Sequence, residues 1–95
     1  MKSIDQLRTE IDQIHLQMNN LLLQRLQLAE QIWQIKNQLN LNFTDLQREE
    51  QMLAHFVSSV DRQNEKDFLK KLHSEIILQS KLFLTKKMET THGQK

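Results

Sequence analysis

The sequence predicts an all-α chain of three helices with a long first helix. Proline is absent and the single glycine is Gly93, so neither of the two strongest helix breakers occurs between Ile4 and about Lys87. Apolar residues also recur at heptad spacing from Ile4 to Leu39. We therefore expect one helical domain at residues 1–87, followed by a disordered C-terminal tail at residues 88–95.

The first helix is predicted over Ile4–Leu39, and two of its heptad positions form a stripe that we call the seam. The seam residues are Ile4, Leu7, Ile11, Ile14, Met18, Leu21, Arg25, Leu28, Ile32, Ile35 and Leu39. At about 1.5 Å per residue the helix spans roughly 54 Å, whereas a globule of this length has a radius of gyration of only about 12 Å. A second copy of the chain is therefore expected to cover the overhang, in a helical homodimer.

Two shorter helices are predicted to follow. The second begins at Thr44-Asp45-Leu46-Gln47, a spacing typical of a capping box. Its apolar face comprises Leu46, Leu53, Phe56, Val57 and Val60. A polar turn from residue 58 to residue 64 separates it from the third helix, which ends near residue 87. The third helix is expected to bury Phe68, Leu69, Leu72, Ile76, Ile77, Phe83 and Leu84.

Composition disfavours several classes of function. The chain has 13 basic and 12 acidic residues, a net charge of +1, so it lacks the positive field of a nucleic-acid-binding protein. It has no cysteine, which removes disulfides and thiolate chemistry, and its four histidines lack metal-ligand spacing. No apolar run has the length of a membrane span, and no signal peptide is apparent. We expect a cytoplasmic protein without nucleic-acid or membrane partners and without a metal.

The seam contains one charge, Arg25, at a position where an apolar residue is expected. A guanidinium group keeps its charge, so burying it is costly unless an anion meets it. Lys36 follows about three turns later and can face the same space between helices. Arg8 lies roughly 42 Å before Lys36, so only the first helix of a second copy would bring it there. The alternative is that Arg25 only fixes register or oligomeric state, or extends into solvent.

Further polar residues accompany these cations. Asp45, Arg48 and Glu49 share one face of the second helix, and Ser80 lies among apolar residues of the third. Each has a structural explanation by itself: a capping carboxylate, an exposed ion pair, or a hydroxyl bonded to its own helix. Together with the cations of the first helix, they predict a small polar pocket that binds a small anion.

Four motifs, spaced and ordered as here, resemble those of the all-helical chorismate mutases. They are Leu7-Arg8-x-Glu10-Ile11-Asp12-x-Ile14, Leu21-Leu22-x-x-Arg25-x-x-Leu28-Ala29-x-x-Ile32-x-x-x-Lys36, Asp45-x-x-Arg48-Glu49 and Ile76-Ile77-x-x-Ser80. The resemblance runs from about Ile4 to Leu84. It implies an intertwined homodimer of three-helix chains that rearranges chorismate to prephenate, in phenylalanine and tyrosine biosynthesis, without a cofactor or metal.

The resemblance also implies a role for each matched residue. Arg25 and Arg48 would bind the substrate carboxylates, helped by Ser80. Lys36 would donate to the ether oxygen of the breaking bond, and Glu49 would accept from the ring hydroxyl. The remaining two matches are Arg8, supplied by the other chain, and Asp45 at the start of the second helix.

Leu84 departs from the family pattern, which has Gln or Glu at this position as a second donor to the ether oxygen. Losing such a donor typically costs about 10²–10³ in rate, so the resemblance predicts a slower mutase. Alternatively, a neighbouring polar group such as Thr85 or Lys81 fills the gap. Two other functions stay open: an isochorismate-pyruvate lyase on the same fold, and a non-catalytic relative that serves as a helical dimerisation module.

Overall fold

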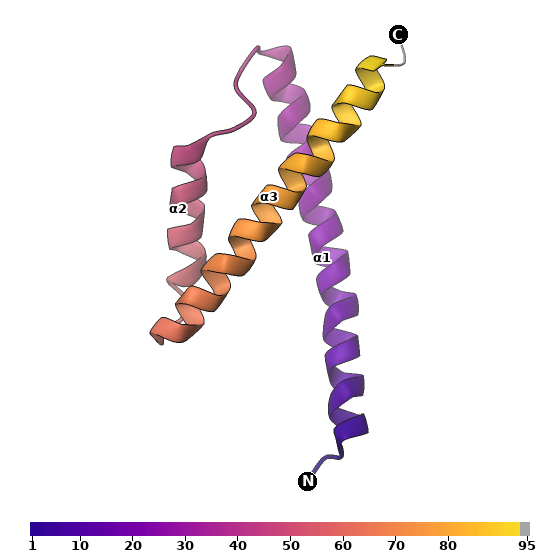
Figure 1. The fold of residues 1–95 in the computed structure, drawn as a ribbon, viewed down its shortest axis with the longest axis vertical. Coiled ribbons are helices and arrows are strands. Elements are labelled where there is room, and N and C mark those ends of the chain that lie inside the picture. Colours follow the sequence, from indigo (N-terminus) through magenta and orange to yellow (C-terminus); the bar gives the residue numbers. More distant parts are fainter. Residues whose placement is uncertain (94–95) are drawn as a thin grey trace. The chain divides into compact units, whose positions relative to one another are not determined.

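The computed structural model of the chain describes residues 1–93, which form three α-helices and no strand over that range. The helices are α1 (Ile4–Gln38), α2 (Leu46–Val57) and α3 (Gln63–Gly93) (Figure 1). The prediction of an all-helical chain with a long first helix is confirmed. However, α3 continues to Gly93 instead of ending near residue 87, and residues 94 and 95 of the predicted tail lie outside the described residues.

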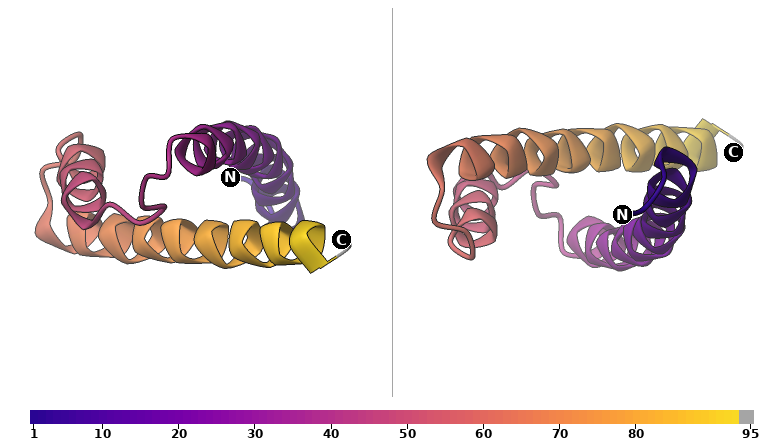
Figure 2. Two further views of the ribbon diagram at one scale, coloured as in Figure 1. Left: turned by 90° about the horizontal axis from the view of Figure 1, so that it is seen from above. Right: turned by 90° about the horizontal axis from the view of Figure 1, so that it is seen from below.

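The chain divides into two compact units, Met1–Ile32 and Trp33–Lys95. The first unit contains only the greater part of α1. The second contains the last turns of α1 together with α2 and α3. Within it, α2 and α3 are joined by a short connection at residues 58–62 and pack against each other (Figure 1, Figure 2). Within residues 1–93, no helix is both long enough and apolar enough to cross a membrane.

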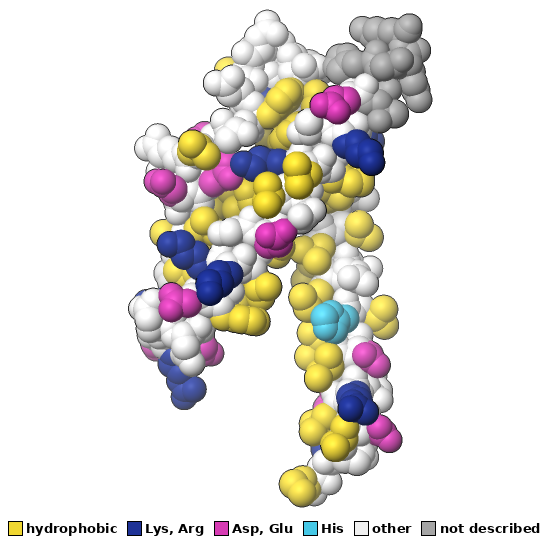
Figure 3. All heavy atoms as spheres, in the orientation of Figure 1, with side chains coloured by type: hydrophobic (Ala, Val, Ile, Leu, Met, Phe, Trp, Pro, Cys, Tyr) yellow, Lys and Arg dark blue, Asp and Glu magenta, His cyan; other side chains and the backbone are white. Residues whose placement is uncertain are grey.

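The first unit has a capped helix start and an exposed apolar stripe. The backbone N–H of Gln6 donates to the Ser3 hydroxyl at 3.1 Å, while the Ser3 N–H donates to the Gln6 side chain at 2.8 Å, which is a reciprocal capping box. Seam residues such as Ile14 and Leu28 remain 54% and 61% exposed. Figure 3 shows hydrophobic side chains at the surface along the N-terminal part of α1. A single helix offers its own stripe nothing to pack against.

The second unit has a small core. Its buried apolar side chains are Trp33, Ile77 and Leu84, which are 8%, 7% and 2% exposed. The rings of Phe56 on α2 and His73 on α3 are also in contact, with centroids 4.5 Å apart and planes tilted by 33°. These contacts fix the helical pair without a large apolar interior.

The predicted buried face of α3 is only partly correct. Ile77 and Leu84 are buried, but Phe68, Leu72 and Phe83 are 62%, 45% and 51% exposed. The reason is orientation: Phe68 and Leu72 lie in the stretch of α3 that runs beside α2, but all three residues are turned by roughly 100° or more around the helix from the buried Leu84.

A left-handed residue ends α1 and turns the chain back. Asn40 has φ 57°, a conformation that Asn tolerates better than most residues. The N–H of Leu41 donates to the Lys36 carbonyl at 2.8 Å, and that of Asn40 donates to the Asn37 carbonyl at 3.3 Å. This pair of bonds is a Schellman motif, which satisfies the last carbonyls of the helix. The loop that follows lies against the last turns of α1, where Phe43 stacks on Trp33 at 4.5 Å.

Candidate active site

Lys36 and Asp45 line one hollow in the second unit, between the end of α1 and the start of α2. The other residues that line it are Leu41, Asn42, Thr44 and Leu46. The Lys36 ammonium is half-buried and donates to the backbone carbonyl of Phe43 at 3.2 Å. Because an ammonium group has three N–H donors, this bond leaves donors for a ligand. The hollow thus presents a cation and a carboxylate from two different helices.

Asp45 is the N-cap of α2. Its side chain accepts a hydrogen bond from the backbone N–H of Arg48 at 3.0 Å, and its own backbone is extended, as an N-cap requires. The capping box predicted one residue earlier, at Thr44, is wrong because Asp45 supplies the capping oxygen. Arg48, in the first turn of α2, is exposed.

Glu49 pairs with a cation on another helix. The Lys81 ammonium lies 2.9 Å from Glu49 Oε1 and 3.2 Å from Oε2, so both carboxylate oxygens accept from α3. The two side chains are 20% and 27% exposed. Sequence reasoning named Lys81 only as a substitute for the missing donor at Leu84. One feature of the sequence could have indicated that Lys81 lies near the site: residues 81 and 84 are three apart on a helix and therefore share a side of it.

Ser80 and Leu84 lie on α3 in contrasting environments. The Ser80 hydroxyl is half-buried and donates to the Ile76 carbonyl at 2.7 Å, as an isolated helical serine commonly does. Leu84 is the most buried of the described side chains, at 2% exposure. Its predicted substrate contact requires that a ligand reach the core of the second unit.

Arg8 and Arg25 lie on α1 in the first unit. The Arg8 guanidinium is 4.0 Å from the Asp5 carboxylate, and the two side chains are 74% and 95% exposed, so the pair is a weak surface contact. Arg25 is only half-exposed, which sets it apart from the apolar seam residues on either side of it, Leu21 and Leu28. The substrate-binding roles of both arginines stay predictions.

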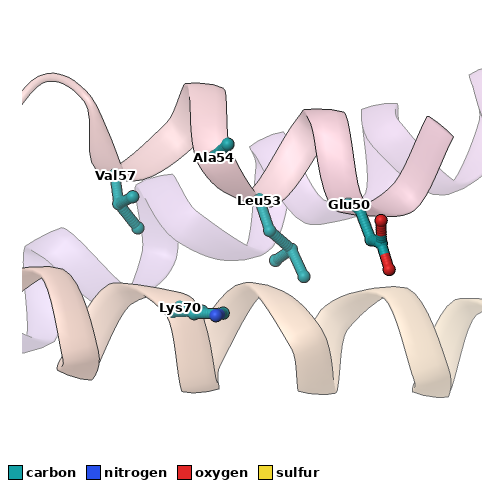
Figure 4. A pocket seen from close by; sticks show the side chains of 5 residues that line it. All are labelled: Glu50, Leu53, Ala54, Val57 and Lys70. Carbon is teal, nitrogen blue, oxygen red and sulfur yellow. The ribbon is translucent and has the colours of Figure 1, made fainter. Parts of the chain in front are cut away.

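A groove between α2 and α3 has a different lining. Its walls are formed by Glu50, Leu53, Ala54, Val57 and Lys70. The side chains of Leu53 and Val57 point from α2 toward α3 (Figure 4). No residue predicted to bind substrate belongs to it. The candidate site is therefore the polar cluster at the start of α2, not this groove.

The polar cluster unites most of the predicted site residues of the second unit. Asp45 and Glu49 are four residues apart and share one side of α2, so the hollow at Lys36 and the ion pair at Lys81 are one helical turn apart. With Arg48, the cluster has three cations against two carboxylates. Such an excess of donors suits a small ligand with more than one carboxylate. Within residues 1–93, no group of three or more potential metal ligands occurs.

Comparison with protein families gives a match to the family described as chorismate mutase type II, over residues 7–83. This match confirms the family resemblance of the four motifs. It includes Lys36, Glu49 and Lys81 but stops one residue before Leu84. Comparison with curated proteins gives no match, and comparison with solved structures gives none either.

Proposed function

Because the chain belongs to the chorismate mutase type II family, we propose that it catalyses the rearrangement of chorismate to prephenate. The observation that carries the proposal is the polar cluster of the second unit. Its lysines, arginine and carboxylates come from three helices, and all of them fall within the range that matches the family. An excess of cations in that cluster suits a substrate with two carboxylates.

The chemistry asks little of the protein beyond position and charge. In one molecule the C–O bond of the enolpyruvyl ether breaks while a C–C bond forms, so no second reactant or cofactor takes part. The substrate must be held in a compact conformer, and negative charge that grows on the ether oxygen must be stabilised. Lys36 fits the second requirement, since its half-buried ammonium has donors beyond the one used by Phe43.

The other roles follow from charge and place. We assign the substrate carboxylates to Arg25 and Arg48, whose guanidinium groups bind carboxylates through two parallel bonds. Glu49 accepts from the ring hydroxyl, and Ser80 adds a polar contact. Asp45 caps α2 and so fixes the helix that presents Arg48 and Glu49, three and four residues later.

We further propose that the active form is an intertwined homodimer. The exposed seam of the first unit supports it, because burying each such side chain contributes about 1.5–3 kcal/mol. In this arrangement Arg8 of one chain completes the site of the other. We place the reaction in phenylalanine and tyrosine biosynthesis in the cytoplasm. The absence of cysteine is compatible with that reducing compartment, in which disulfides are rare.

The test is the loss of chorismate absorbance with purified protein, with prephenate identified as the product. We expect Arg25→Ala to lower kcat/KM by at least about 10²-fold, because a charged donor to the substrate is lost. Arg62→Ala is the matched control: Arg62 pairs only locally with Glu65 and is 82% exposed, so its loss should leave the rate unchanged. Leu84→Gln should raise kcat by adding a donor for the ether oxygen.

Other outcomes would redirect the proposal. Pyruvate released from isochorismate, without prephenate from chorismate, would identify a lyase. If wild type and Leu84→Gln neither convert nor bind chorismate, the mutase proposal fails and the dimerisation module takes its place. In that case Arg25→Leu should stabilise the protein, since an apolar seam residue would replace an unneeded charge.

A further inference from the structure

We propose that Lys81 is a positioning residue of the active site: it holds the Glu49 carboxylate in place and balances its charge when a dianionic substrate enters. The inference rests on the proposed function. The four motifs do not include Lys81, which the sequence suggested only as an alternative donor to the ether oxygen and not as a partner of Glu49.

The contact geometry favours a fixed carboxylate. The Lys81 ammonium lies within 3.2 Å of both Glu49 oxygens, so the carboxylate is restrained in its rotation as well as its position. The pair joins α2 to α3 across 32 residues of sequence, whereas the Arg62–Glu65 pair spans a single turn at the surface. Side-chain exposures of 27% and 20% mean that solvent screens the pair much less than the surface pair.

Charge gives the second reason. Glu49 is proposed to accept from a hydroxyl of a substrate that has two negative charges of its own. An uncompensated carboxylate beside such a ligand would repel it, and the repulsion grows in a partly buried site. The Lys81 ammonium reduces this repulsion and still leaves Glu49 able to accept a further hydrogen bond, since a carboxylate has about four acceptor sites.

The neighbours of Lys81 give the third reason. Lys81 directly follows Ser80 and precedes Leu84 by three residues, so it lies on the same side of α3 as the apolar residue at the family's donor position. The Leu84 side chain cannot orient a polar group. The Lys81 ammonium, by contrast, is a polar group of α3 that contacts the cluster directly, through Glu49.

A purely structural ion pair would give a different result, and substitutions separate the two. Lys81→Met keeps length and removes charge, Lys81→Arg keeps charge, and Glu49→Gln removes the partner. Lys70→Met is the matched control, because Lys70 is an exposed lysine of the same helix beside the groove between α2 and α3. Circular dichroism and thermal unfolding of each variant report folding independently of activity.

We expect Lys81→Met to lower kcat by about 10²-fold, as a misplaced catalytic group does, with a smaller change in KM. Lys81→Arg should recover most of the rate, and Lys70→Met should equal wild type. In the Glu49→Gln background, Lys81→Met should change kcat by less than about 3-fold, since a residue that acts through Glu49 has no effect once Glu49 is removed.

The inference is overturned if Lys81→Met keeps the wild-type kcat and alters only the melting temperature. It is also overturned if the effects of Lys81→Met and Glu49→Gln multiply in the double variant. If wild type binds chorismate by calorimetry without converting it, the same four variants are compared by Kd, and equal Kd values for wild type and Lys81→Met overturn the inference. If wild type neither converts nor binds chorismate, the proposed function itself fails, and the role of Lys81 falls with it.

Discussion

The two units of the chain differ in how far their apolar side chains are buried. The second unit contains the buried side chains Trp33, Ile77 and Leu84, and Asp45 caps the start of its helix α2. The first unit is one helix, and the apolar residues of its seam are exposed from Ile4 to Ile32. Most polar groups with a proposed catalytic role thus belong to the unit that has buried side chains, whereas Arg25 and Arg8 belong to the unit whose apolar stripe is exposed.

The difference sets the source of stability for each unit. Association of two chains loses translational and rotational freedom at an estimated cost of about 4–15 kcal/mol. Several seam side chains, each contributing about 1.5–3 kcal/mol when buried, offset that cost. The first unit should therefore gain its stability from a second copy, and the second unit from its own core.

The largest expected effect comes from a substitution in the seam of the first unit, which should disrupt the proposed dimer. Ile14→Asp places a carboxylate in the seam, and an unpaired buried charge costs about 3–5 kcal/mol. We expect the dimer to dissociate at micromolar concentration in sedimentation velocity runs. Gln13→Asp is the control, because position 13 is turned by roughly 100° from the seam residue that follows it. A variant with Ile14→Asp that stays dimeric would show that the seam is not the interface.

The next effect compares the same type of change in both units. Leu84→Ala removes the most buried side chain of the second unit and should lower the free energy of unfolding by about 2–5 kcal/mol. Leu21→Ala in the seam should lower the melting temperature by an amount that depends on protein concentration, because its burial occurs on association. Thermal unfolding at two concentrations measures both. A melting temperature of Leu21→Ala that shifts equally at each concentration would contradict the comparison.

The smallest effect concerns the two helix caps. Asp45→Ala should destabilise the second unit by about 1 kcal/mol, because the N–H of Arg48 loses its acceptor. Ser3→Ala should fray only the first turn of α1, so amide hydrogen exchange should rise near residue 6 while the melting temperature barely moves. Asp45→Asn keeps a capping oxygen and serves as the control for stability. Equal thermal destabilisation by Asp45→Ala and Ser3→Ala would argue against the difference between the units.

Much of this architecture is readable in the sequence, for identifiable reasons. Uninterrupted heptads and the absence of proline predict α1 to within one residue at its end, since periodicity and backbone propensity are local properties. The exposure of Phe68 and Phe83 was not predictable, because it depends on which face of α3 is covered in the folded chain. The sequence also could not decide whether Thr44 or Asp45 caps α2, because both side chains have an oxygen that can accept the capping hydrogen bond.

The candidate site shows the same limit. Lys36 and Asp45 were chosen from the sequence and share one hollow. Lys81 was considered from the sequence only as a substitute donor. Its bond with Glu49, 32 residues away in sequence, depends on the packing of α2 on α3. Contacts of that range follow from tertiary packing, so a local pattern cannot specify them.

The stacking of Trp33 on Phe43 makes intrinsic tryptophan fluorescence a probe of the candidate site. Trp33 is the single tryptophan of the chain, and the carbonyl of the phenylalanine on which it stacks accepts from the Lys36 ammonium. All indole fluorescence therefore arises beside the loop that leads to Asp45. An anion that draws Lys36 away from this carbonyl changes the surroundings of one indole, so ligand titrations can be followed by intrinsic emission without any attached dye.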